Sequence, residues 1–291
     1  MFKNTLKTTV LLAALGGLIV AVASMLGGGS SSAVMIGLVI ALAMVGGSYW
    51  FSDRLALASA KAQVITEADH PEFYGMVRDL AQRANLPMPR VALSPADQPN
   101  AFATGRNPSN AVVCATTGLL NSLSREEVEG VMAHELMHVR NRDILIGSVA
   151  AAIATAISSI AQMAMFASMF AGGQDDEDRP NPLAVLLISL VAPMAAGLIQ
   201  MAVSRSREFE ADRSAAELLG TGEPLARALE KIEVLAGARP MAVAPAQAQA
   251  YIHNPLAEFN GRRGGGPNMA RLFSTHPATE ERIRRLRTMA F

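Results

Sequence analysis

Charged residues are missing from three long stretches of the 291-residue chain, at positions 8–52, 144–174 and 180–204. A helix needs about 20 apolar residues to cross the hydrocarbon layer of a membrane. The first stretch is long enough for two such helices, and the run of Gly and Ser at 27–32 supplies a turn between them. The pattern therefore predicts four membrane-spanning helices, at about 8–26, 33–51, 144–170 and 183–203.

Lysine and arginine at the ends of the predicted spans indicate which way the chain is inserted. If the four helices form two hairpins, one side of the membrane carries Lys3, Lys7, Arg54, Lys61, Arg140, Arg142, Arg205 and Arg207. The opposite side carries a single arginine, Arg179. Because basic flanks face the cytoplasm, both termini are expected there, in a protein of the inner membrane. A cleaved signal peptide with residues 11–22 as its apolar core is the alternative for the first span, and it would leave this orientation unchanged.

The segments outside the spans carry shorter patterns. Apolar residues at helical spacing predict helices at 69–82, from 208 to about 219, at 224–236 and at 279–289. Short β-branched runs predict strands at 89–93 and 111–115, and residues 100–104 form another strand or an extended segment. Residues 239–268, rich in Ala, Pro, Gln and Gly, are expected to form a mobile loop. The fold class that follows is an α+β integral membrane protein, mainly α-helical, with four transmembrane helices and a small β-sheet.

These predictions divide the chain into four parts. Residues 1–52 form one transmembrane hairpin and 144–203 a second, while 53–143 and 204–291 form the two halves of a cytoplasmic domain. Hydrophobic residues make up 51% of the chain and charged residues only 17%, against about 25% charged in soluble domains. The formal net charge is zero, and nothing in the charge pattern indicates nucleic-acid binding. The single cysteine, Cys114, allows no intrachain disulfide and is expected to be a small buried apolar residue.

The stretch His134-Glu135-Leu136-Met137-His138 places two imidazoles one helical turn apart, with a carboxylate beside them. This is the arrangement of a hydrolytic zinc site. A helix is predicted here because Ser124 can serve as the N-cap and Glu127 as its partner in a capping box.

A catalytic zinc ion keeps three protein ligands, so a third ligand is expected elsewhere in the chain. Glu208 is the best candidate, and Asp212 shares its helix face at i+4 spacing. Asp212 can accept the N–H of a ligating imidazole and so fix its tautomer. In this hypothesis His134, His138 and Glu208 hold one Zn²⁺ per chain, and Glu135 acts as the general base in peptide hydrolysis.

Four ordered segments carry a family resemblance: NAFATG at 100–105, HELMHVRNRD at 134–143, SRSREFEAD at 204–212 and STHP at 274–277. The chain resembles the membrane-bound HtpX-type heat-shock metalloproteases, which belong to the gluzincin class. The resemblance covers essentially the whole chain and implies a zincin-like catalytic domain, four membrane spans and protein quality control under stress.

The resemblance also implies roles for further residues. It assigns substrate binding to Asn100, Ala101, Phe102 and Ala103, where an exposed sheet edge would bind extended peptide backbone. His276 is implied as a group that stabilises the transition state, although a turn before Pro277 explains the local sequence equally well. Asp143 can orient a ligand, pair with an arginine of the segment at 204–212, or cap the helix.

The predicted function is hydrolysis of misfolded or damaged membrane proteins at the cytoplasmic face, with polypeptides and the lipid bilayer as partners. Two alternatives remain from the residues alone. One is a narrower processing enzyme of the CAAX-endopeptidase type, against which four spans argue. The other is a non-catalytic membrane scaffold that uses zinc for folding, against which Glu135 argues.

Overall fold

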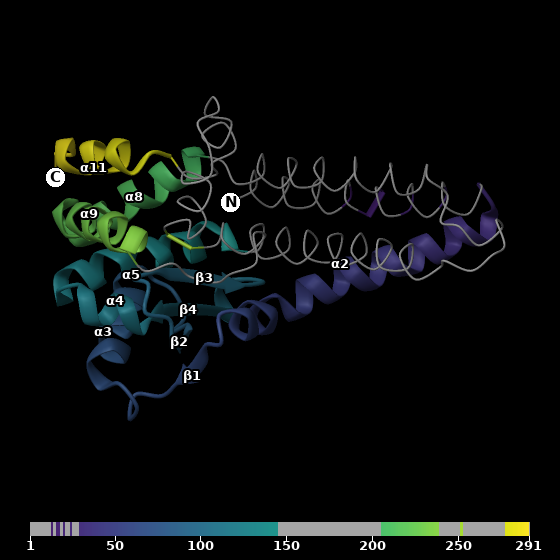
Figure 1. The fold of residues 1–291 in the computed structure, drawn as a ribbon, viewed down its shortest axis with the longest axis horizontal. Helices are drawn as coiled ribbons and strands as arrows, with labels where there is room; N and C mark the ends of the chain where they lie inside the picture. The colour runs from purple at the N-terminus through teal and green to yellow at the C-terminus, as the bar shows by residue number, and fades with distance from the viewer. Residues whose placement is uncertain are drawn as a thin grey trace.

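The computed structural model describes residues 29–144, 205–238, 251–252 and 277–290, with a few isolated positions before residue 29. Figure 1 shows these parts as a body of helices around a small sheet, from which one long helix extends. The predicted spans at 8–26, 144–170 and 183–203 lie outside the described residues, apart from single positions. The mainly helical architecture with a small sheet agrees with the expected fold class.

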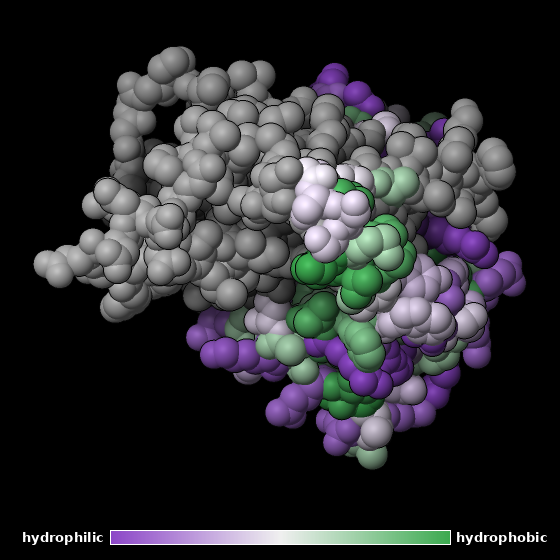
Figure 2. All heavy atoms as spheres, turned by 90° about the vertical axis from the view of Figure 1, so that its right-hand side faces the viewer, coloured by the Kyte–Doolittle hydropathy of each residue, from purple (hydrophilic) through white to green (hydrophobic). Residues whose placement is uncertain are grey.

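The long helix is α2 (Ser31–Ser59), which contains the predicted second span and continues beyond it to residue 59. The continuation is reasonable because residues 55–59 are Leu and Ala with one Ser, and Leu and Ala are strong helix formers. Much of the helix surface is apolar and exposed, as at Met35, Ile36, Val39, Leu42 and Trp50. Figure 2 shows apolar side chains gathered together on this side of the molecule, above a more hydrophilic region. Across the described residues, no helix combines the length and the apolar character that a membrane crossing requires.

The sheet has four strands in the order β1-β2-β4-β3. Strands β2 (Arg90–Ser94) and β4 (Ala111–Thr116) pair in parallel at its centre. Strand β3 (Ala101–Gly105) pairs antiparallel with β4 and forms one edge, and β1 (Gln63–Ile65) forms the other. The residues at 100–104 thus fold as a strand, displaced by one position. Strand β1 was not predicted, because three mostly exposed residues carry no usable apolar alternation.

Helix α5 (Arg125–Asn141) lies against the sheet and contacts β3, β4 and α3 (Pro71–Arg83). The short helix α4 (Thr117–Ser122) leads into it. The predicted capping box is present, since the Ser124 N–H donates to the Glu127 carboxylate at 2.8 Å and the Ser124 hydroxyl accepts the N–H of Glu127. These bonds satisfy backbone donors that the first turn of a helix leaves open.

Helices α8 (Arg205–Leu219) and α9 (Glu223–Ala238) cover α5 on the side away from the sheet, and α11 (Thr279–Thr288) packs on both of them. Their bounds agree with the predicted helices to within three residues. Gly220 ends α8 with φ of +76°, a conformation that glycine adopts without strain.

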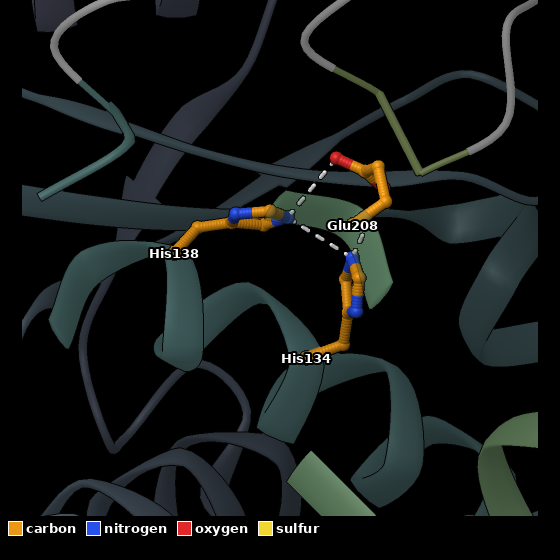
Figure 3. Close-up of side chains that lie close together, drawn as sticks. All are labelled: His134, His138 and Glu208. Carbon is orange, nitrogen blue, oxygen red and sulfur yellow. Dashed lines mark hydrogen bonds and ion pairs between the residues drawn. The ribbon is translucent and has the colours of Figure 1, made fainter. Parts of the chain in front are cut away.

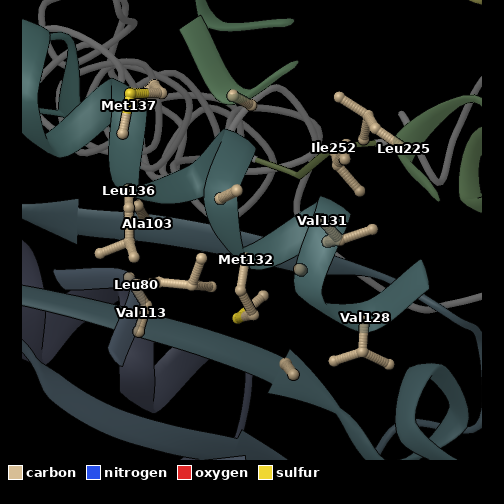
Figure 4. Close-up of a cluster of buried hydrophobic side chains, with 14 of the residues drawn as sticks. Leu80, Ala103, Val113, Val128, Val131, Met132, Leu136, Met137, Leu225 and Ile252 are labelled. Carbon is tan, nitrogen blue, oxygen red and sulfur yellow. The ribbon is translucent and has the colours of Figure 1, made fainter. Parts of the chain in front are cut away.

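Helix α5 is therefore buried on both sides. The core that surrounds it is drawn in Figure 4 and includes Leu80, Val113, Met132, Leu136 and Leu225. Gly130 allows the close approach of α9, because a Cβ built there would lie 2.7 Å from the backbone nitrogen of Leu225. The helix that carries the two histidines is thus held in place by packing from the sheet and from α8 and α9.

Candidate metal centre

The two histidines of α5 turn their Nε2 atoms toward each other and toward Glu208 on α8. The Nε2 atoms are 3.1 Å apart, and Glu208 carboxylate oxygens lie 3.7 Å from Nε2 of His134 and 3.5 Å from Nε2 of His138. Figure 3 shows the three side chains around one point. The sequence separates Glu208 from His134 by 74 positions, and the packing of α8 on α5 brings them together.

These separations fit a metal ion. Zinc bonds to histidine nitrogen and carboxylate oxygen are about 2.0–2.2 Å long, so tetrahedral ligands lie about 3.4 Å apart. The three observed separations fall on both sides of this value. Among the described residues, His134, His138 and Glu208 form a group whose ligand atoms all lie within 4.8 Å of one another. A donor set of two imidazoles and one carboxylate, without cysteine, is typical of catalytic zinc sites.

A carboxylate lies behind each of the two imidazoles. Asp212 Oδ1 lies 2.9 Å from Nδ1 of His134, and Asp143 Oδ2 lies 3.4 Å from Nδ1 of His138. Each carboxylate favours a proton on Nδ1, which leaves the Nε2 lone pair free for a metal ion. The structure thus places Asp212 and Asp143 behind the two histidines, and Asp143 also lies 3.7 Å from the guanidinium of Arg207.

Arg282 of α11 is part of this site, although the sequence analysis did not select it. Its guanidinium donates two hydrogen bonds to Asp212, at 2.8 and 2.7 Å. Nη1 lies 3.7 Å from Glu208, and Nη2 lies 3.4 Å from Nε2 of His134. The sequence offers only a weak signal for this role, which is the i, i+4 spacing of Arg282 and the apolar Leu286 on one face of α11.

The electrostatics of the site favour a cation. Burial and the neighbouring cations lower the pKa of His134, despite the opposing effect of Asp212, and this favours the neutral imidazole that binds metals. Burial also acts to lower the pKa of His138, but Glu208, Asp143 and Glu135 outweigh it and raise this pKa to about 9. The pKa of Asp212 is lowered to about 2, because Arg282 and His134 outweigh its burial.

The formal charges lead to the same conclusion. Four carboxylates belong to the site, those of Glu135, Asp143, Glu208 and Asp212, and all are buried. Two guanidinium groups, Arg207 and Arg282, oppose them. With neutral imidazoles, the net formal charge is −2, which matches a divalent metal ion.

The remaining predicted residues are placed as follows. Glu135 is 2% exposed, and its charge acts on His138 and Arg282. Asn100, which precedes β3, and Ala101, Phe102 and Ala103 within it are all buried. His276 lies outside the described residues. Cys114 is fully buried on β4, and burial raises the pKa of its thiol, as expected for a small core residue.

Comparison with known proteins now identifies the family. Residues 67–290 match peptidase family M48. The chain belongs to peptidase family M48. Two relatives described as Protease HtpX homolog, from Burkholderia mallei strain ATCC 23344 and Burkholderia pseudomallei strain K96243, are each 53% identical over 291 residues. The match covers 99% of this chain and 97% of each relative.

Membership of family M48 and the 53% identity to the HtpX homologs together confirm the predicted HtpX-type metalloprotease. A solved structure, that of S. mikatae Ste24p, is similar in fold, with a TM-score of 0.50 at 20% identity. The similarity covers 98% of this chain and 66% of that one. This M48 metalloprotease therefore spans about two thirds of the length of Ste24p, and its His-His-Glu group is consistent with a bound metal ion.

Proposed function

We propose that this M48 metalloprotease is an integral-membrane zinc endopeptidase that cleaves misfolded or damaged membrane proteins at the cytoplasmic face. The observation that carries the catalytic part is the convergence of His134, His138 and Glu208 at separations of 3.1–3.7 Å, with Glu135 on the same helix. Zinc is proposed because two imidazoles and one carboxylate form a donor set that zinc prefers.

In the proposed mechanism, zinc supplies a Lewis acid when bound, which polarises the scissile carbonyl and acidifies a water molecule. Glu135 accepts the proton of the attacking water and passes it to the leaving amine. Asp212 and Asp143 hold the imidazoles in the ligating tautomer, and Arg282 keeps Asp212 charged and in position. Asn100–Ala103 would bind the extended backbone of the substrate, and His276 would stabilise the developing oxyanion.

The membrane part of the proposal rests on the charge-free stretches of the sequence and on the exposed apolar surface of α2. Four spans in two hairpins would place both termini, residues 53–143 and residues 204–291 in the cytoplasm. Residue 143 precedes the third predicted span directly, and Glu208 follows the fourth by about five residues. The zinc ion would then lie close to the membrane surface, which favours membrane proteins as substrates.

The experiment that tests the catalytic proposal compares zinc content and cleavage of β-casein, an unfolded protein, in detergent. Glu135→Gln is expected to retain zinc and to lose at least 10²-fold in cleavage, because only the proton acceptor is removed. Glu208→Ala is expected to lose zinc as well. Glu129→Gln, on the same helix but partly exposed, serves as the matched control and should keep both properties. Equal cleavage by wild type and Glu135→Gln would refute the mechanism and favour the scaffold alternative.

A further inference from the structure

Two residues of the stretch at 239–268 pair with the edge of the sheet. Tyr251 forms an antiparallel bridge with Phe102 of β3, and the Ile252 N–H donates to the Ala101 carbonyl at 3.0 Å. The aromatic rings of Phe102 and Tyr251 contact edge to face, with centroids 5.0 Å apart.

This edge is the one next to the candidate metal centre. Of the two edges of the described sheet, β3 contacts helix α5, which carries both histidines. An edge strand presents unpaired backbone groups, to which an extended peptide can add as a further strand. Tyr251 and Ile252 therefore use backbone groups that a substrate would need.

The side chains of the pair also fill space beside the edge. Tyr251 packs in a cluster with Phe102, Val112 and Cys114, and Ile252 packs in the main core. Both residues are only 3% exposed. The spaces they occupy suit an aromatic and an aliphatic side chain that follow each other in an extended chain.

The pair is further linked to the metal centre through Arg282. Nη1 of Arg282 donates to the Ile252 carbonyl at 3.3 Å, while the other guanidinium nitrogens donate to Asp212. If Ile252 leaves, the same N–H becomes available to a carbonyl of an incoming peptide. The backbone pairing itself is limited to a single bridge among the described residues, whereas a substrate strand could pair along all of β3.

We infer that Tyr251–Ile252 holds the β3 edge in place of a substrate, so that the resting enzyme is closed by its own chain and opens when this pair is displaced. The inference rests on the proposed function, since it concerns the substrate edge of the proposed peptidase. It also names the favoured displacing peptide: an extended segment in which an aromatic residue precedes an aliphatic one.

A reversible crosslink tests this inference. The Ile252-to-Ala101 bond flanks the Phe102–Tyr251 pair, which makes the pair non-hydrogen-bonded, with Cα atoms about 4.5 Å apart in such pairs. This spacing suits a disulfide. The variant is Phe102→Cys with Tyr251→Cys, made with Cys114→Ala because Cys114 lies opposite Phe102 on β4.

Oxidation of this variant is expected to lower β-casein cleavage at least tenfold, and reduction with a phosphine should restore it. Zinc content and melting temperature should not fall on oxidation, because the bond holds the resting conformation. The two single-cysteine variants in the Cys114→Ala background are the controls, and oxidation should not change their activity. Equal cleavage by the oxidised and reduced forms would show that the pair is a permanent strand and would overturn the inference.

Hydrogen exchange on the full chain with Glu135→Gln gives a second test that needs no change at the edge. Saturating β-casein is expected to speed exchange of the Ile252 amide several-fold while the amides of β3 stay protected. Unchanged or slower exchange at Ile252 would contradict displacement. Failure of the proposed function itself is distinguishable, because wild-type protein would then not cleave β-casein.

Discussion

The carboxylate of Asp212 lies between two partners with different tasks. It faces Nδ1 of His134 on one side and receives two hydrogen bonds from Arg282 on the other. All three groups are buried, so each depends on the others to satisfy its charge or hydrogen bonds. A change at Arg282 should therefore affect both the fold and the metal centre, even though Arg282 is not a candidate ligand.

Arg282→Gln is expected to destabilise the protein by about 3–5 kcal/mol, because it leaves Asp212 buried without its cation. Zinc affinity should also fall, by about 10- to 100-fold, as His134 loses a well-oriented partner. Thermal melting in detergent and competition with a chelator measure the two effects. Arg284→Gln is the control on the same helix, since the Arg284 side chain is 71% exposed and pairs only with Glu281 in the described part of the chain. A variant of Arg282 with the melting temperature of the Arg284 variant would show that the buried pair does not stabilise the fold.

The elements around the metal centre are set by local signals to different degrees. The capping box at Ser124 and Glu127 predicts where α5 begins, and a helix places His134 and His138 on one face. Helices α3, α8, α9 and α11 are predicted for the same reason, because each carries its periodicity and its end signals in its own sequence. These signals lie within each helix and its flanking residues, so they can be read without knowing the tertiary structure.

The parts that the sequence does not disclose depend on contacts between distant positions. Arg282 meets Asp212 across 70 residues and His134 across 148. The helical spacing predicted at 279–289 does not mark Arg282 as a site residue, because the packing of α11 on α8 and α9 is what buries it. The pairing of Tyr251 with Phe102 is equally non-local, and a stretch rich in Ala, Pro and Gly gives no period from which to derive it.

The N-terminus of α5 yields a pH-dependent prediction. Burial acts to raise the pKa of Glu127, but hydrogen bonds from Lys231 and from the Ser124 N–H outweigh it, so the pKa is lowered. The folded state therefore favours the charged form. The stability that ionised Glu127 contributes is fully present above the pKa of Glu127 in the unfolded state, about 4.3. It is lost as the pH falls through the lower pKa of Glu127 in the folded state.

Glu127→Gln should accordingly lower stability by about 1 kcal/mol at pH 7, through the weakened cap and the lost Lys231 pair. The difference from wild type should shrink as the pH falls below about 4. Melting temperatures across this pH range provide the measurement. A difference that grows toward acid pH would contradict the lowered pKa.

Packing between elements can be tested at Gly130, where α5 meets α9. A methyl group there would lie 2.7 Å from the Leu225 nitrogen, so Gly130→Ala forces the helices apart. The substitution should lower the free energy of unfolding by about 1–3 kcal/mol. Gly75→Ala in α3 is the matched control, because its new methyl group meets only the end of Arg78, at 3.8 Å. Gly75→Ala should raise the free energy of unfolding by about 0.5–1 kcal/mol, because alanine has a higher helix propensity than glycine. Equal melting temperatures for the two variants would show that α9 is free to move away.

For the whole molecule, the proposed topology predicts which side of the membrane each part occupies. The proposed topology places the turn before α2 outside the cytoplasm and α11 inside it. Figure 1 shows this turn at the far end of α2 from the sheet and the candidate metal centre. A chemical label that cannot cross membranes can therefore distinguish the two ends.

The wild-type chain serves as the negative control for thiol labelling. Cys114 is its only cysteine, and burial both shields the thiol and raises its pKa, so a maleimide should not react with it. Ser30→Cys and Glu280→Cys each add one thiol at an exposed position, the first before α2 and the second in α11. In intact spheroplasts an impermeant maleimide should label the first variant and not the second, and permeabilisation should expose the second. The reverse pattern would place the metal centre outside the cytoplasm. Labelling of both variants in intact spheroplasts would exclude the two-hairpin topology, because the turn before α2 and helix α11 would then lie on the same side of the membrane.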